Sequence, residues 1–214
     1  MIVGMDRENL RKMKKEKLSN NKKAKTKIWF IDWFKYFEAY LELARVGLLQ
    51  LDKQEYPPET LFKKDSIYGD QILLIPIIWC LKHSIELLFK FLDIRITQEF
   101  SFVHDNTQLN NEIKHAFSKL KISNSVLLKE FIILSDKYFK LKFWDSFITL
   151  RSDIYDDAND IFRYPESRGS FSLNIGELHK ITEENKLELK KDIERLSKLS
   201  LKLYSEITSA KIKK

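Results

Sequence analysis

Three polar residues in the segment HSIELLFK have the types and spacing of a small chemical site. His83, Glu86 and Lys90 follow one another at intervals of three and four residues, which places all three on one face of a helix, beside its apolar stripe. An imidazole, a carboxylate and an ammonium would then share one ligand-binding site. The same spacing also describes an ordinary ion pair between Glu86 and Lys90 on an exposed helix, which stabilises by only roughly 0.2–0.5 kcal/mol.

A second candidate is the tetrapeptide Phe162-Arg163-Tyr164-Pro165, which lies where a long helical region meets a proline. The planar guanidinium of Arg163 could bind a phosphate with two hydrogen bonds, or it could tie a carboxylate such as Glu86 to the loop. Arg163 and Tyr164 therefore join the candidate ligand-binding residues, with both alternatives open.

The acidic set Asp153, Asp156, Asp157 and Asp160 could direct several carboxylates toward a hard cation such as Mg²⁺. No acidic motif elsewhere completes a catalytic metal site, so we interpret these residues as a solvated helix face and predict no metal. The chain also has no phosphate-binding glycine loop, paired zinc ligands or nucleophile elbow, and no cofactor is predicted. Cys80 lies in an apolar run and is expected to be an inert core residue.

The elements that position these residues are predicted to be helices. No glycine or proline occurs between Ile77 and Tyr164, and such stretches rich in Leu, Ile, Lys and Glu favour helices. The expected helices are Trp29 to Leu49, Asp70 to Leu92 with a kink or restart at Pro76, Asn110 to Leu120, Ser123 to Leu141, Trp144 to Ile161, and a long final helix capped by Thr182. A short hairpin is expected near residues 169–176.

Apolar residues at helical spacing predict which helix faces form the core. The first stripe is an aromatic one in the first helix, and two others follow in the central and final helices. The stripes are Trp33, Phe37, Tyr40, Leu41 and Ala44; Trp79, Leu87, Leu88 and Phe91; and Leu187, Leu189, Ile193, Leu196 and Leu199. The pattern predicts an all-α bundle with one helical domain over residues 29–214.

The net charge of +7 is confined to a basic tail. Residues 1–28 contain 10 basic and 3 acidic side chains, whereas residues 29–214 contain 28 of each. The tail is interpreted either as a disordered, solubilising leader or as a phosphate-binding segment that adds salt-sensitive affinity for nucleic acid. The candidate nucleic-acid contacts are Arg11, Lys12, Lys14, Lys15, Lys22 and Lys23.

Cysteine usage and hydropathy indicate a cytoplasmic protein. A single cysteine excludes an intrachain disulfide framework, which is typical of reducing compartments. The N-terminus lacks the apolar stretch of a signal peptide. The most apolar run, Ile72 to Leu81, has about half the length that a membrane span needs, so no membrane association is expected.

Three fragments of the chain resemble the HEPN superfamily of small bacterial proteins. LKHSIELLFK resembles its His-x-x-Glu-x-x-x-Lys helix, and FRYP resembles its Arg-Tyr-Pro segment. EIKHAFSKL resembles its Gly-His-Asp-Leu segment, with His115 in the histidine place, although Lys114 and Ala116 depart from that pattern. The resemblance covers about Ile72 to Pro165, with the fragments in the family's order.

The resemblance implies an up-and-down helical bundle, commonly dimeric, from toxin-antitoxin, antiphage-defence or RNA-processing systems. Many members are metal-independent ribonucleases with an arginine four to six residues before a histidine. Here Arg95 precedes His104 by nine positions and Arg168 precedes His179 by eleven, so that catalytic pair cannot be assigned.

The prediction is therefore a non-catalytic HEPN-like binding or regulatory component, either a homodimer or part of a complex with a partner protein, that contacts RNA or a nucleotide. Its predicted ligand-binding residues are His83, Glu86, Lys90, His115, Arg163 and Tyr164. Two alternatives remain open: a ribonuclease with a divergent active site built on His115 and Arg163, and a structural assembly subunit.

Overall fold

The computed structural model of the chain describes residues 25–53, 69–98, 103–139 and 182–212. In these residues the chain forms five helices and no strand, so the prediction of an all-α bundle is confirmed. The helices are α2 (Lys25–Lys53), α3 (Gly69–Thr97), α4 (Asn106–Lys119), α5 (Val126–Phe139) and α6 (Glu183–Ile212).

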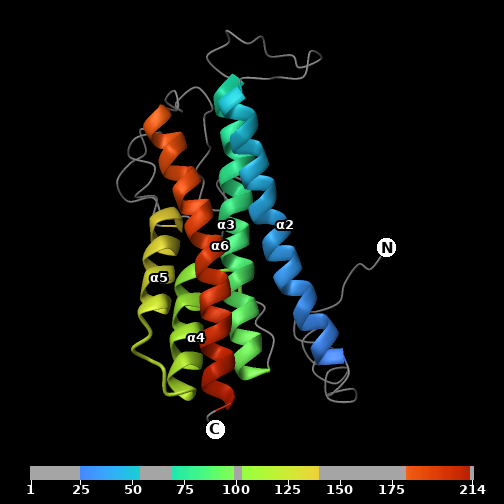
Figure 1. Cartoon of the computed structure of the whole chain (residues 1–214), viewed down its shortest axis with the longest axis vertical. Coiled ribbons are helices and arrows are strands. Elements are labelled where there is room, and N and C mark those ends of the chain that lie inside the picture. Colours follow the sequence, from blue (N-terminus) through green and yellow to red (C-terminus); the bar gives the residue numbers. More distant parts are fainter. Residues whose placement is uncertain (1–24, 54–68, 99–102, 140–181, 213–214) are drawn as a thin grey trace, which may run out of the picture.

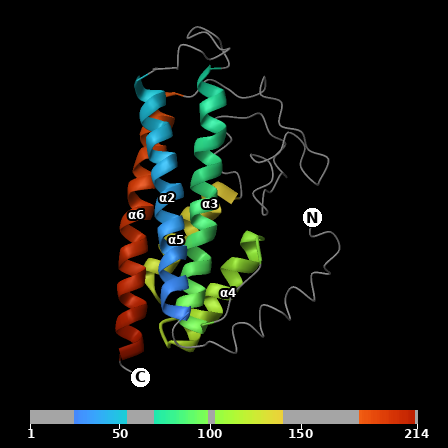
Figure 2. The same ribbon diagram turned by 90° about the vertical axis from the view of Figure 1, so that its right-hand side faces the viewer.

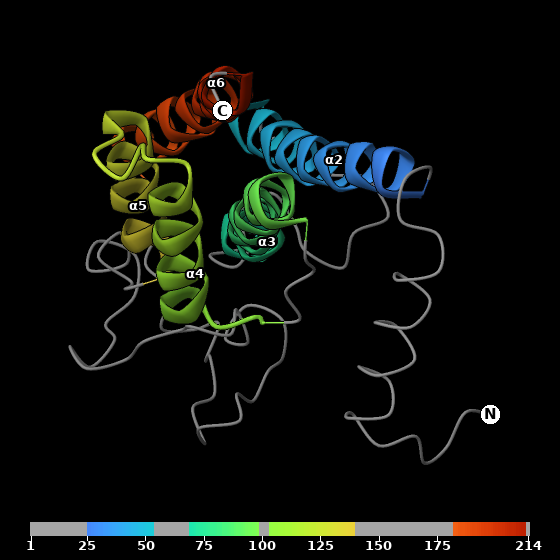
Figure 3. The same cartoon turned by 90° about the horizontal axis from the view of Figure 1, so that it is seen from below.

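Helix α3 is the centre of the bundle, because it packs against each of the other described helices. Every residue from 84 to 94 is buried, as expected for a helix that is apolar on nearly all sides. Helices α2 and α3 run antiparallel (Figure 1), and α2, α3 and α6 extend alongside one another over the length of the bundle (Figure 2). Seen from below, α6 lies between α2 and α5, while α4 and α5 cover another side of α3 (Figure 3).

The central helix does not restart at its proline. Pro76 lies inside α3, where it removes one backbone hydrogen bond and usually kinks or breaks a helix. Its flanking residues Leu74, Ile77 and Ile78 are buried against the rest of the core. Burial of these side chains holds the helix together across Pro76, so of the two predicted alternatives, a kink or a restart, the restart does not occur.

Capping residues explain where two helices begin. Asp105 caps α4 by accepting a 2.7 Å hydrogen bond from the backbone N–H of Gln108, so this helix begins four residues earlier than the apolar pattern indicated. Thr182 caps α6 as predicted: its hydroxyl accepts a hydrogen bond from the N–H of Asn185 at 3.2 Å.

The predicted apolar stripes form most of the observed core, with one correction. Leu189, Ile193, Leu196 and Leu199 of α6 are buried, but Leu187 is 51% exposed. Leu187 lies two positions before Leu189, which is about 200° around the helix, so it faces away from the buried stripe.

Helices α2 and α3 approach each other closely at Gly47. A Cβ atom on Gly47 would lie 2.6 Å from Cγ1 of Ile77, which is buried. Because Ile77 is β-branched, its side chain has few alternative rotamers in a helix. Glycine at this position therefore sets how near the two helices can pack.

We expect Gly47→Ala to lower the free energy of unfolding by about 1–3 kcal/mol, the usual effect of overpacking a core, although alanine is the better helix former by about 1 kcal/mol. Urea unfolding of the wild type and variant measures the difference. In an Ile77→Ala background the same change should be neutral or stabilising, and an equal loss in both backgrounds would contradict this explanation.

Several predictions fall on residues outside the described ones. These are the basic tail up to residue 24, the helix from Trp144 to Ile161, the acidic set, the Arg163–Tyr164 segment and the hairpin near residues 169–176. The last four residues of the predicted tail belong to α2, which begins at Lys25. Among the helices that are described, none is long and apolar enough to cross a membrane.

Candidate functional site

A buried carboxylate and a buried ammonium form the centre of the candidate site. Glu86 and Lys90 are each only 3% exposed, and Lys90 Nζ donates a 2.7 Å hydrogen bond to Glu86 Oε1. The sequence placed these residues on one helix face, and they do interact. The alternative of an intrahelical ion pair is also found, but the pair is buried rather than exposed, because the packing around α3 removes both charges from solvent.

A histidine that the sequence did not single out completes the cluster. His104, in the segment before α4, places its Nδ1 atom 2.7 Å from Glu86 Oε1. Its side chain is 64% exposed, so one edge of the ring contacts the buried carboxylate while the rest faces solvent. His104 lies 18 residues from Glu86 on a different segment, and no spacing rule within one helix could have paired them.

Opposing effects set the ionisation of Glu86. Burial raises the pKa of its carboxyl group, but hydrogen bonds from His104 and His83 and the positive charge of Lys90 together hold that pKa well below its usual range. The carboxylate is therefore ionised and can only accept hydrogen bonds. A hydrogen bond between His104 and this carboxylate therefore requires the proton on Nδ1 of His104.

His83 connects this cluster to a group of aromatic side chains. Its Nδ1 atom lies 3.4 Å from Glu86 Oε2. The ring stacks on Trp79, with centroids 5.3 Å apart and an interplanar angle of 9°. It also meets Tyr40 edge-on, at 4.5 Å. Contacts on two sides and a carboxylate on a third fix the orientation of this imidazole.

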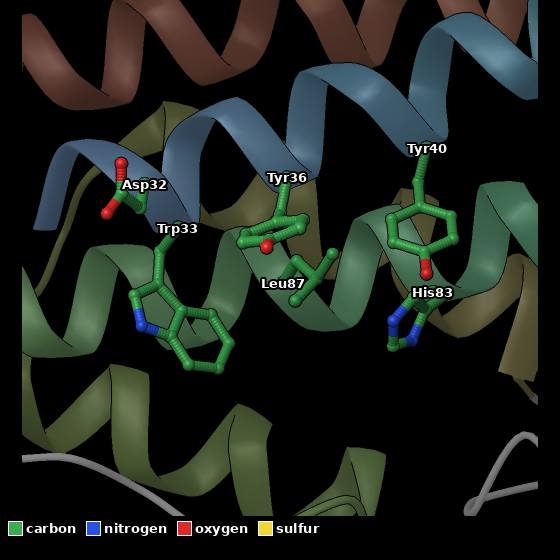
Figure 4. A pocket seen from close by; sticks show the side chains of 6 residues that line it. All are labelled: Asp32, Trp33, Tyr36, Tyr40, His83 and Leu87. Carbon is green, nitrogen blue, oxygen red and sulfur yellow. The ribbon is translucent and has the colours of Figure 1, made fainter. Parts of the chain in front are cut away.

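Next to His83, α2 and α3 form a groove of about 420 Å³, called here the aromatic groove. Figure 4 shows Trp33, Tyr36 and Tyr40 projecting from α2 on the same side, with Leu87 of α3 next to Tyr36 and His83 of α3 beneath Tyr40. The residues that line the groove are Asp32, Trp33, Tyr36, Tyr40, His83 and Leu87. Tyr36 is 61% exposed, so a large aromatic surface is accessible to a ligand.

The sequence interpreted the aromatic stripe of α2 only as a core face. Phe37, Leu41 and Ala44 are indeed buried, but Trp33 and Tyr40 are only partly buried and line the groove. The spacing of three and four residues from Trp33 through Tyr36 to Tyr40 was the available signal, since it continues the aromatic surface past the edge of the core.

The other candidate residues are not part of this cluster. His115 is exposed on α4, and within the described residues no hydrogen bond or ion pair joins its ring to Glu86 or Lys90. Arg163 and Tyr164 lie outside the described residues. Cys80 is buried, and burial raises the pKa of its thiol, which agrees with an inert core cysteine.

The cluster predicts a specific loss of stability in acid. The lowered pKa of Glu86 means that its stabilising contribution is complete above the unfolded-state pKa, about 4.3, and is lost as the pH falls below that value. We expect the urea midpoint of the wild type to fall more steeply than that of Glu86→Gln between about pH 5 and pH 3. Parallel pH profiles would show that Glu86 does not contribute in this way.

Comparison of the chain with protein-family models, with curated proteins and with solved structures finds no match. The resemblance to the HEPN superfamily therefore stays a prediction. Within the described residues, no group of three His, Cys, Asp or Glu side chains could hold a metal ion. In the Glu86 cluster the ammonium of Lys90 occupies the position next to the carboxylate where a cation would bind.

Proposed function

We propose that the chain is a non-catalytic, HEPN-like binding component of a prokaryotic antiphage-defence or toxin-antitoxin system, and that its aromatic groove binds an unpaired nucleobase of RNA or of a free nucleotide. The observation that carries the binding part is the convergence of Trp33, Tyr36, Tyr40 and His83 on one accessible groove. The biological setting rests on the resemblance of the sequence fragments.

The chemistry of the groove suits a nucleobase. Unpaired bases in RNA are commonly bound by stacking on aromatic side chains and by hydrogen bonds to their edges. The groove offers indole and phenol faces for stacking, and polar groups from Asp32, the tyrosine hydroxyls and His83 for hydrogen bonding. Its volume of about 420 Å³ is also within the usual range of small-ligand sites. The carboxylate of Asp32 disfavours a phosphate at that end, so we expect the base rather than the phosphate to enter.

The Glu86 cluster supports a positioning role. Glu86 and Lys90 are buried and hydrogen-bonded to each other, so neither can reach a bound phosphate. Glu86 instead orients His83, which is one wall of the groove. We therefore interpret the cluster as the support of the binding groove.

A single assay tests binding and catalysis together. Purified full-length protein is mixed with labelled total cellular RNA at low and moderate salt, and the products are analysed for both mobility shift and cleavage. The proposal predicts retarded RNA of unchanged length, with competition by free nucleotides if the mononucleotide is the ligand. If the RNA is not retarded and no nucleotide competes for binding, the proposal is overturned.

A second candidate function is a metal-independent ribonuclease, and the hydrogen bond between His104 and Glu86 is the observation that favours it. A carboxylate that holds Nδ1–H of a histidine leaves Nε2 able to act as a general base. In such a reaction His104 Nε2 takes the proton of a ribose 2′-hydroxyl. The 2′-oxygen then bonds to the adjacent phosphorus while the bond to the 5′-oxygen breaks, and that oxygen takes a proton from water.

Two histidine variants test the second candidate. If the chain cleaves RNA through His104, His104→Ala should reduce the rate by about 10²–10⁴-fold, the usual effect of losing a general base. His115→Ala tests the rival site predicted from the sequence, because His115 is exposed on α4 and lies outside the cluster; loss of cleavage in that variant alone would assign catalysis to His115. Cleavage that both variants retain would exclude His104 as the general base, and no cleavage by the wild type would leave only the binding function.

A further inference from the structure

A second groove, between α5 and α6, is lined mainly by basic side chains. Its volume is about 410 Å³, and it is called here the basic groove. Its lining residues are Glu130, Lys191, Glu194, Arg195, Lys198, Leu199 and Lys202. The four cations recur on α6 at intervals of four, three and four residues, so they form one stripe along a helix face.

This concentration of charge is not visible in the composition, because residues 29–214 contain equal numbers of basic and acidic residues. Several carboxylates of α6 are engaged elsewhere. Glu188 and Asp192 both pair with Lys137 of α5, and Glu206 accepts a 2.6 Å hydrogen bond from Ser125. These three acidic side chains are therefore directed away from the stripe, whereas Glu194 and Glu130 lie in the groove, and Glu130 pairs with Arg195.

Three lysines of the stripe remain exposed and available. Lys191, Lys198 and Lys202 have no hydrogen-bond or ion-pair partner among the described residues. Arg195 differs, since Glu130 accepts a 2.6 Å hydrogen bond from its Nε atom and fixes its guanidinium at the groove. The lysines extend over about 16 Å of helix, which is long enough to face several consecutive phosphates of one strand.

We propose that the basic groove binds the phosphate backbone of a nucleic-acid strand, as a site separate from the aromatic groove. The two grooves share no lining residue and are built on different helix pairs. The proposal does not depend on the aromatic groove binding a base.

The residues that line the basic groove favour a nucleic acid over a protein partner. Protein interfaces are enriched in aromatic residues and depleted in lysine, whereas this groove contains several lysines and no aromatic residue. An acidic membrane surface is the rival partner, because a membrane-surface helix presents exposed apolar residues beside its basic face, and Leu187 and Leu201 of α6 are 51% and 58% exposed. Phosphates in a concave groove that contains lysines and a fixed arginine match this arrangement.

The test compares two triple variants of the full-length chain with equal net charge. The groove variant carries Lys191→Gln, Lys198→Gln and Lys202→Gln. The control variant carries Lys114→Gln, Lys121→Gln and Lys129→Gln, which are exposed lysines outside the groove. Binding of an oligouridylate is measured by fluorescence anisotropy over a range of salt concentrations.

We expect the groove variant to reduce the slope of log K against log salt by about two, because each phosphate contact to a single strand contributes about 0.7. The control variant should keep the wild-type slope within error. Equal slopes in the two variants would overturn the proposal, since binding would then depend on overall charge or on the basic tail. Loss of binding to vesicles of acidic lipid with unchanged RNA binding would also overturn it, in favour of a membrane surface.

Discussion

Glu86→Gln should lower the free energy of unfolding by about 3–5 kcal/mol, the usual cost of breaking a buried ion pair by removing one partner. The neutral amide leaves the ammonium of Lys90 buried without a counter-charge. It also weakens the hydrogen bonds that hold His83 and His104. Urea unfolding at neutral pH, followed by circular dichroism, measures the loss.

Two comparisons show whether burial is the cause. Glu42→Gln removes the carboxylate of another intrahelical pair, with Arg45, in which both side chains are about half exposed, and it should leave stability nearly unchanged. The double variant Glu86→Gln, Lys90→Met should recover most of the lost stability, because the uncompensated buried charge is gone. A double variant no more stable than Glu86→Gln would show that the charge of Lys90 is not the reason.

Tyr36→Ala should weaken binding of RNA or nucleotide by about 5- to 150-fold, which corresponds to the roughly 1–3 kcal/mol contributed by one stacked base. Tyr36 lines the aromatic groove and is 61% exposed. The variant should therefore remain as stable as the wild type, so that a loss of affinity reports on the ligand contact rather than on folding. Isothermal titration calorimetry or anisotropy measures the change.

Leu43→Ala is the matched control for this prediction. Leu43 is 57% exposed on the same helix and does not line the groove, so its removal should not alter affinity. Tyr36→Phe should keep most of the binding, because it retains the aromatic face. If Tyr36→Ala and the wild type bind RNA or nucleotide with equal affinity, the aromatic groove is not the binding site.

The helices were predictable from sequence because their signals are local. Long stretches without glycine or proline, apolar residues at helical spacing and the cap at Thr182 all act within a few turns of one helix. The same reasoning left a kink and a restart open at Pro76, where burial of Leu74 and Ile77 keeps the helix continuous across a local helix breaker. It also failed to determine whether Glu86 and Lys90 are exposed, because burial depends on the neighbours of α3.

The candidate site was predictable only in the part that one helix contains. The spacing of His83, Glu86 and Lys90 placed them together, whereas the contact between Glu86 and His104 joins two segments and appears only after folding. The aromatic groove and the basic groove are likewise formed between pairs of helices. Helical spacing within α2 separated Phe37, which is buried, from Tyr36, which is 61% exposed, but it could not show that Tyr36 lines a groove formed with α3.

Crosslinking of RNA to the full-length chain tests the central claim most directly. RNA that contains 4-thiouridine is bound to the protein, irradiated, and digested, and the modified peptides are mapped by mass spectrometry. Binding of a base in the aromatic groove predicts crosslinks at Trp33, Tyr36 or Tyr40, with loss of the signal in Tyr36→Ala. Crosslinks confined to residues 1–24 or to the basic groove, with none on α2, would contradict the claim.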